Sequence, residues 1–189
     1  MRLSDISLLL AQALVVVAVV ALVLALVVFM RRAGKFIAET REAERFRRTV
    51  ADLSARIVTS LDGVSGRIDG VRRHTVAADA ISDSLTAAAD AVVRYADEAR
   101  ALDGPEPAAP IRDALVNELE RAKRALQIVE HGCGILASAR SDLRTPEAET
   151  SIKRGYLNIL HAREAIMRHA ARAADVGVTP PRLFERRGA

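Results

Sequence analysis

An apolar run of 23 residues constrains this chain more than any other feature of its sequence. From Leu8 to Met30 the only polar residue is Gln12. An α-helix of this length reaches roughly 35 Å, which covers the ~30 Å hydrocarbon core of a bilayer. A buried helix of a globular domain rarely runs this far without a polar face. We therefore predict one transmembrane helix over residues 6–30.

The charges beside this run predict its orientation. Arg31, Arg32 and Lys35 follow the run closely, whereas the residues before it are close to neutral. Because basic residues concentrate on the cytoplasmic side of a spanning helix, we expect residues 1–5 outside and the rest of the chain in the cytoplasm. A cleaved secretory signal would need a basic start and an apolar stretch of only about 7 to 15 residues. The expected location is the inner (cytoplasmic) membrane, with a single pass.

Composition narrows the possible functions of the cytoplasmic part. The net charge of +4 is spread along the chain, so nucleic-acid binding is not expected. Of the 28 basic residues only Lys35, Lys123 and Lys153 are lysine, and this arginine bias in an Ala- and Val-rich chain is typical of a GC-rich bacterial genome. The only cysteine, Cys133, has no partner for an internal disulfide, which agrees with a reducing compartment.

Beyond the apolar run, hydrophobic residues repeat with helical period and do not alternate as they do in strands, so the predicted fold class is all-α. One register of seven is apolar at every step: Ala43, Val50, Ile57, Val64, Val71, Ala78, Leu85, Val92 and Ala99. A second seam accompanies it: Phe46, Leu53, Leu61, Ile68, Ile81, Ala88, Tyr95 and Leu102. Two seams at this spacing are typical of a coiled coil or a helical bundle.

Breaks in the pattern predict the domain boundaries. Three glycines in residues 62–70 indicate a kink, hinge or turn, because each costs about 1 kcal/mol inside a helix. The stretches 103–110 and 142–146 contain prolines and predict loops between helices over 72–102, 111–141 and 147–175. We predict a three-helix up-down-up bundle over 72–177 that folds independently and a flexible basic tail over 178–189.

The sequence leaves two arrangements open for residues 31–71. They could form a helical stalk with a glycine-rich hinge at 62–70, or fold back as the first helix of a four-helix bundle. We favour the stalk, because the register of seven continues through Val64 and Val71. A stalk leaves its apolar seam uncovered, and Ala11, Ala18, Ala21 and Ala25 form a stripe of small residues in the spanning helix. This combination predicts a homodimer through anchor and stalk.

The strongest candidate for chemistry is the stretch 129–136, which contains His131 and Cys133. Folding the last two helices against each other places His131 opposite His161, near Glu130 and Glu164, as a metal site in a bundle would require. The helical wheel, however, turns both imidazoles away from the shared interface. We therefore predict no catalytic, cofactor-binding or metal-binding residue, and we interpret Cys133 as a small buried hydrophobic residue.

These features predict a non-catalytic protein that is anchored in the membrane and presents helical interaction surfaces at the cytoplasmic face, to itself or to another protein. The alternative is an accessory component of a membrane signalling complex that uses residues 62–70 as a hinge. A metal-binding helical bundle is a minor alternative.

Overall fold

The computed structural model describes the backbone of residues 3–138 and 144–177, together with their side chains except those of 3–21, 25 and 32–38. The described residues are all-α, as predicted, with helices α1 (Leu3–Arg72), α2 (Ser82–Arg100), α3 (Ala109–Ala137) and α4 (Thr145–Ala174). Short 3₁₀ helices η1 (Asp79–Ile81) and η2 (Glu106–Ala108) precede α2 and α3. The chain divides into two compact units, Met1–Arg41 and Glu42–Ala189, and α1 belongs to both. The predicted tail over 178–189 lies outside the described residues.

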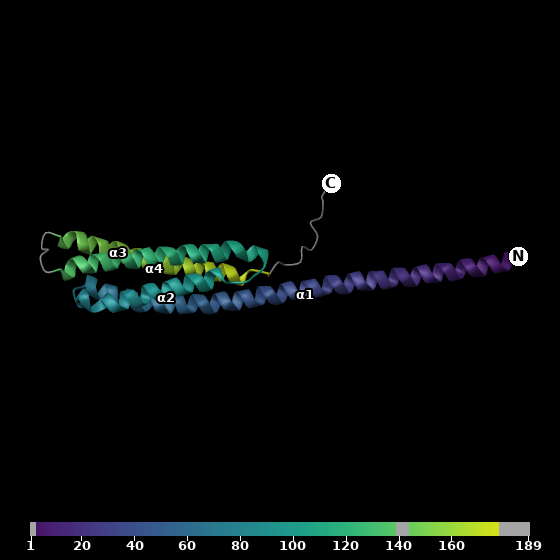
Figure 1. Ribbon diagram of the computed structural model, residues 1–189, viewed down its shortest axis with the longest axis horizontal. Helices are drawn as coiled ribbons and strands as arrows, with labels where there is room; N and C mark the ends of the chain where they lie inside the picture. Colours follow the sequence, from purple (N-terminus) through teal and green to yellow (C-terminus); the bar gives the residue numbers. More distant parts are fainter. Residues whose placement is uncertain (1–2, 139–143, 178–189) are drawn as a thin grey trace, which may run out of the picture. The chain divides into compact units, whose positions relative to one another are not determined.

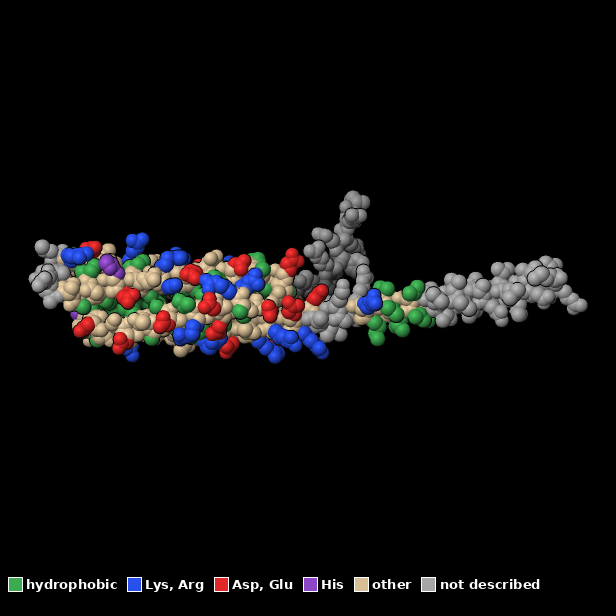
Figure 2. All heavy atoms as spheres, in the orientation of Figure 1, with side chains coloured by type: hydrophobic (Ala, Val, Ile, Leu, Met, Phe, Trp, Pro, Cys, Tyr) green, Lys and Arg blue, Asp and Glu red, His purple; other side chains and the backbone are tan. Residues whose placement is uncertain are grey.

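The first unit contains the segment that the sequence predicts to span a membrane. Within the described residues, no helix combines the length and the apolar character that a membrane crossing requires, so the structure does not support the spanning helix predicted over 6–30. Most of that prediction falls on side chains that lie outside the described residues. Those of its side chains that are described are apolar and exposed, as Figure 2 shows in green: Leu22, Val23, Leu24, Leu26, Val27, Val28, Phe29 and Met30.

The second unit is a four-helix bundle made of residues 42–72 of α1 and the three later helices. Figure 1 shows α1 and α2 side by side in one layer and α3 and α4 side by side in the other. Successive helices are antiparallel and joined by short connections, which gives an up-down-up-down topology. The apolar stripe of each helix faces a shared core, which contains both seams seen in the sequence.

The structure thus differs from the stalk that we favoured for residues 31–71. From Ala43 to Val71 the seam positions of α1 are buried in the core of the same chain, and Val50 and Ile57 are completely inaccessible. The physical reason is that the three later helices leave one side of their core open, and α1 closes it. The bundle therefore begins near residue 42 and not at 72. The uncovered seam that suggested a stalk dimer is covered within the chain.

The position of the first turn also differs from the prediction. Residues 62–70 remain helical, and the chain turns immediately after Arg72. The amide of His74 donates to the carbonyl of Val71, and the amide of Thr75 donates to that of Gly70, which is the Schellman pattern of a helix C-terminus. His74 occupies the left-handed position, with a φ of 56°. Glycine is the usual residue at this position, so the sequence around His74 did not predict that the helix ends here.

Of the three glycines in 62–70, only Gly70 takes part in this turn. A Cβ at Gly70 would come within 2.7 Å of the Val76 side chain, because the returning chain packs directly against this position. Gly63 and Gly66 have open space where a Cβ would be. The glycine signal therefore located the turn to within a few residues, but it did not mark a hinge inside the helix.

Two buried serines of α1 give a first testable prediction. Ser54 and Ser65 are 5% and 6% exposed, and neither hydroxyl has a hydrogen-bond partner within the described part of the chain. Removing an unsatisfied buried hydroxyl relieves its desolvation cost, and alanine is the better helix former. We expect Ser54→Ala and Ser65→Ala each to raise the free energy of unfolding by about 1 kcal/mol in chemical denaturation. Ser60→Ala, half-buried on the same helix, is the matched control for helix propensity. A loss of stability at Ser54 or Ser65 would contradict this assignment.

Candidate functional site

The stretch 129–136, which contains the candidate residues of the sequence, lies where the backbones of α3 and α4 approach closely. A Cβ at Gly132 would come within 2.9 Å of the backbone oxygen of Ala148. A Cβ at Gly155 would come within 2.8 Å of the backbone oxygen of Ala125. One glycine on each helix therefore allows the two backbones to approach closely. Gly132 thus allows a close crossing of α3 and α4, whereas Gly134 has open space at its Cβ position.

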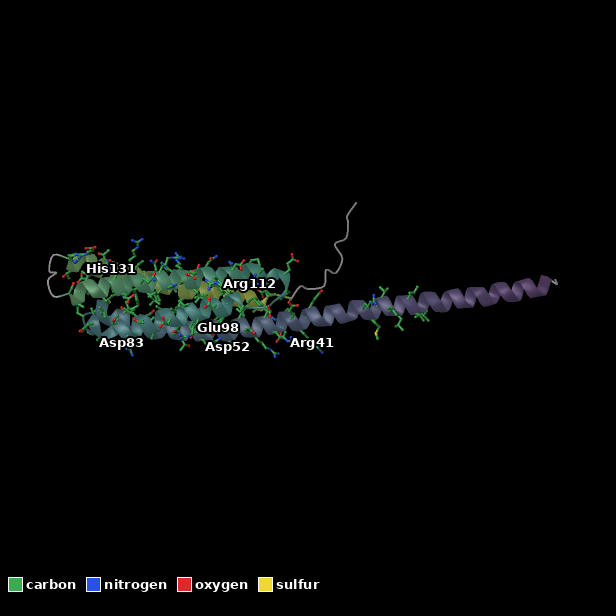
Figure 3. The ribbon with its side chains drawn as sticks, in the orientation of Figure 1. Arg41, Asp52, Asp83, Glu98, Arg112 and His131 are labelled. Carbon is green, nitrogen blue, oxygen red and sulfur yellow. The ribbon has the colours of Figure 1, made fainter. Side chains whose placement is uncertain are left out.

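The histidines of this region lie on the outside of the bundle. His131 and His161 are both exposed, as the helical wheel predicted, and Figure 3 shows His131 on the outward side of α3. Among the described residues, no group of three or more His, Cys, Asp or Glu side chains is placed to hold a metal ion. The structure therefore does not bring together the five residues weighed as a metal site: Glu130, His131, Cys133, His161 and Glu164.

Cys133 is buried in the core beneath this surface. Its side chain is 5% exposed and belongs to the hydrophobic cluster of the bundle, which confirms its interpretation as a small hydrophobic residue. Burial and, to a lesser degree, the nearby Glu130 carboxylate raise the pKa of the thiol to about 11. The thiolate is the reactive form, so this environment suppresses nucleophilic and metal-ligand chemistry at Cys133.

The buried thiol leads to a second prediction, about chemical reactivity. At pH 8 the raised pKa reduces the thiolate fraction about a hundredfold relative to an ordinary cysteine. We expect iodoacetamide to label native Cys133 at least about a hundredfold more slowly than an exposed cysteine, introduced as Ala87→Cys in a Cys133→Ser background. In denaturant the two cysteines should react at similar rates. Equal rates in the native protein would show that the thiol is accessible.

Ion pairs connect neighbouring helices in three of the four grooves of the bundle. Between α1 and α2, Arg56 Nη2 lies 2.6 Å from Glu98 Oε2, and Figure 3 labels Glu98 and the neighbouring Asp52, which also pairs with Arg56. Between α2 and α3, Arg100 Nη2 lies 2.7 Å from Glu120 Oε1. Each of these pairs contributes little to stability, because the side chains are partly exposed.

The third bridged groove lies between α1 and α4. There Arg163 pairs with Asp62, and the Arg72 guanidinium lies 4.5 Å from the centre of the Tyr156 ring. Together with the two pairs above, these contacts place an arginine and a carboxylate across every groove that involves α1 or α2. The bundle thus has a repeated pattern of charge neutralisation between adjacent helices.

The groove between α3 and α4 departs from this pattern. Among the described residues, no ion pair crosses it. It has a volume of about 500 Å³, and we call it the α3–α4 groove, lined by Arg124, Gln127, Ile128, His131, Ser151 and Arg154. Of these six residues, only His131 belongs to the candidate site predicted from the sequence. The spacing of seven between Arg124 and His131 placed them on one face of a helix, but only the folded structure brings Arg154 to the opposite wall.

Comparisons with family models, with curated proteins and with solved structures find no match to this chain.

Proposed function

We propose that this protein is a single-pass, non-catalytic helical interaction protein that holds its bundle at the cytoplasmic face of the inner membrane. The exposed apolar segment 22–30 carries the proposal. Leu22, Phe29 and Met30 are 71%, 69% and 66% exposed, and successive residues of a helix point about 100° apart, so apolar side chains surround the helix. A continuous apolar surface of this kind is unusual in water and is stable when lipid covers it.

The sequence around this segment supports the same proposal. The apolar run extends back to Leu8, and Arg31 and Arg32 end it on one side only. This asymmetry favours an external N-terminus and a cytoplasmic bundle. The bundle then offers the outer faces of four helices to partners. The signalling alternative depended on a hinge at 62–70, and a continuous helix there gives it no support. The predicted homodimer depended on an uncovered seam in the stalk. The chain buries that seam in its own core, so we do not include the homodimer in the proposal.

A membrane-extraction experiment tests the anchor. We expect the full chain to remain in the membrane pellet after a carbonate wash. Leu22→Arg combined with Leu26→Arg should release it, because each arginine costs about 2.5 to 3.5 kcal/mol at the centre of a spanning helix. Leu157→Arg, on the exposed side of α4, is the matched control and should stay in the pellet. A wild-type chain that appears in the soluble fraction would refute the proposal.

Two further measurements address orientation and interaction. A reporter that is active only in the cytoplasm, fused after Ala189, should be active, and neutral replacements of Arg31, Arg32 and Lys35 should reduce that activity. Activity of a reporter that works only outside the cytoplasm would reverse the orientation.

A photo-crosslinking residue at exposed Leu157 or Val93 should form discrete protein adducts in membranes, whereas one at buried Val50 should not. A complete lack of adducts at exposed positions would refute the interaction role.

A further inference from the structure

The α3–α4 groove has positive charge on both walls, and none of the described residues that line it is a carboxylate. Arg124 lies on α3 and Arg154 on α4, and neither forms an ion pair with any residue that the structure describes. In the other three grooves, Arg56, Arg100 and Arg163 each cross between helices to an Asp or Glu partner. The α3–α4 groove is therefore the place on the bundle where a negative charge from outside the chain would complete the repeated pattern.

The other lining residues suit an oxyanion. Gln127 can donate through its amide, Ser151 through its hydroxyl, and His131 through a ring nitrogen. Ile128 contributes an apolar surface between the polar groups. His131, labelled in Figure 3, is exposed, so a ligand can reach it from solvent. The donors come from both helices, so one ligand could contact both walls at once.

We propose that the α3–α4 groove binds a phosphate-type oxyanion between Arg124 and Arg154. A guanidinium presents paired N–H donors that match two oxygens of a phosphate, and two guanidinia on opposite walls can grip one phosphate group from both sides. Binding also relieves the repulsion between unpaired like charges on the two walls. The ligand is either a free phosphate ester or the headgroup of an anionic phospholipid, which share this chemistry. The proposal needs only the folded bundle and does not rest on the membrane anchor.

The test uses the full chain in a sugar-based detergent without phosphate, with pyrophosphate as the first probe. We expect saturable shifts of the backbone amide signals of Gln127 and Ser151, which lie on opposite walls. Arg124→Gln and Arg154→Gln should each weaken binding about tenfold, because each removes a charge-assisted hydrogen bond. Arg94→Gln is the matched control: Arg94 is exposed on α2 and pairs with no described carboxylate, and its loss should leave the affinity unchanged.

A second arm separates the two sources of phosphate. The same amide signals are compared in nanodiscs of phosphatidylcholine alone and in nanodiscs that also contain phosphatidic acid. Shifts with pyrophosphate in detergent support a free phosphate ester. Shifts only with phosphatidic acid, again lost in the Arg124 and Arg154 variants, support a lipid headgroup. The proposal is overturned if neither probe shifts these signals, or if Arg94→Gln weakens binding as much as the groove variants do.

Discussion

Replacing Gly155 with alanine should lower the free energy of unfolding by about 2 kcal/mol, because the added methyl group has no space at the α3–α4 contact. Its Cβ would lie 2.8 Å from the backbone oxygen of Ala125 and 3.1 Å from the backbone nitrogen of Val129. Backbone atoms cannot rotate away as a side chain can, so the two helices must move apart. That movement would loosen the packing around the contact. Gly132→Ala should act similarly, because its Cβ would approach the backbone of Ala148 and Ile152.

Gly134 supplies the matched control on the same helix. No atom lies within 4 Å of a Cβ built at this position. Gly134→Ala should therefore raise stability by about 1 kcal/mol, through helix propensity alone. Urea denaturation of the three variants, followed by circular dichroism, measures these differences. If all three substitutions stabilise the protein equally, the close approach of α3 and α4 does not exist in solution.

Removing residues 1–71 should abolish cooperative folding of the remaining bundle, and this is the largest effect we expect. The truncation deletes nine buried apolar residues of the core: Ala43, Phe46, Val50, Leu53, Ile57, Leu61, Val64, Ile68 and Val71. Burying a large apolar side chain contributes about 1.5 to 3 kcal/mol, so the loss exceeds about 10 kcal/mol. A typical domain has only about 5 to 15 kcal/mol of net stability. A chain that starts at residue 72 should thus melt gradually, whereas one that starts at residue 42 should unfold in a single transition.

A pair of valine substitutions tests, without truncation, whether α1 is part of the bundle core. Val50 on α1 is completely buried, whereas Val93 on α2 is 38% exposed. Val50→Asp should cost several kcal/mol, because it places a carboxylate in the core without a partner. Val93→Asp should change stability by less than about 1 kcal/mol. Calorimetry of the full chain in detergent distinguishes these outcomes. A cooperative transition in a chain that starts at residue 72, or a harmless Val50→Asp, would restore the stalk arrangement.

Local residue pattern was sufficient to identify most of the bundle core. Both seams counted from Ala43 and Phe46 are mostly buried, and Ile152, Ile159 and Ile166 of α4 are buried at the same helical spacing. Helical period is a property of neighbours three and four residues apart, so it can be read without knowing what the helix packs against. The break around 103–110 was found for a similar reason, since proline acts locally. Of the loop predicted over 142–146, residues 142 and 143 lie outside the described residues, and α4 already begins at Thr145.

Tertiary structure alone decided which helices share the core. An apolar seam on residues 43–71 can be covered equally well by a second chain or by the chain's own later helices, and periodicity does not distinguish the two. The choice between these two arrangements depends on whether the chain can turn back after Arg72. His74 adopts the left-handed conformation of that turn, where glycine would be expected. The α3–α4 groove likewise depends on two arginines 30 residues apart, which line the same groove only because α3 and α4 pack side by side. Local sequence determines the faces of helices, whereas the pairing of those faces follows from contacts between distant parts of the chain.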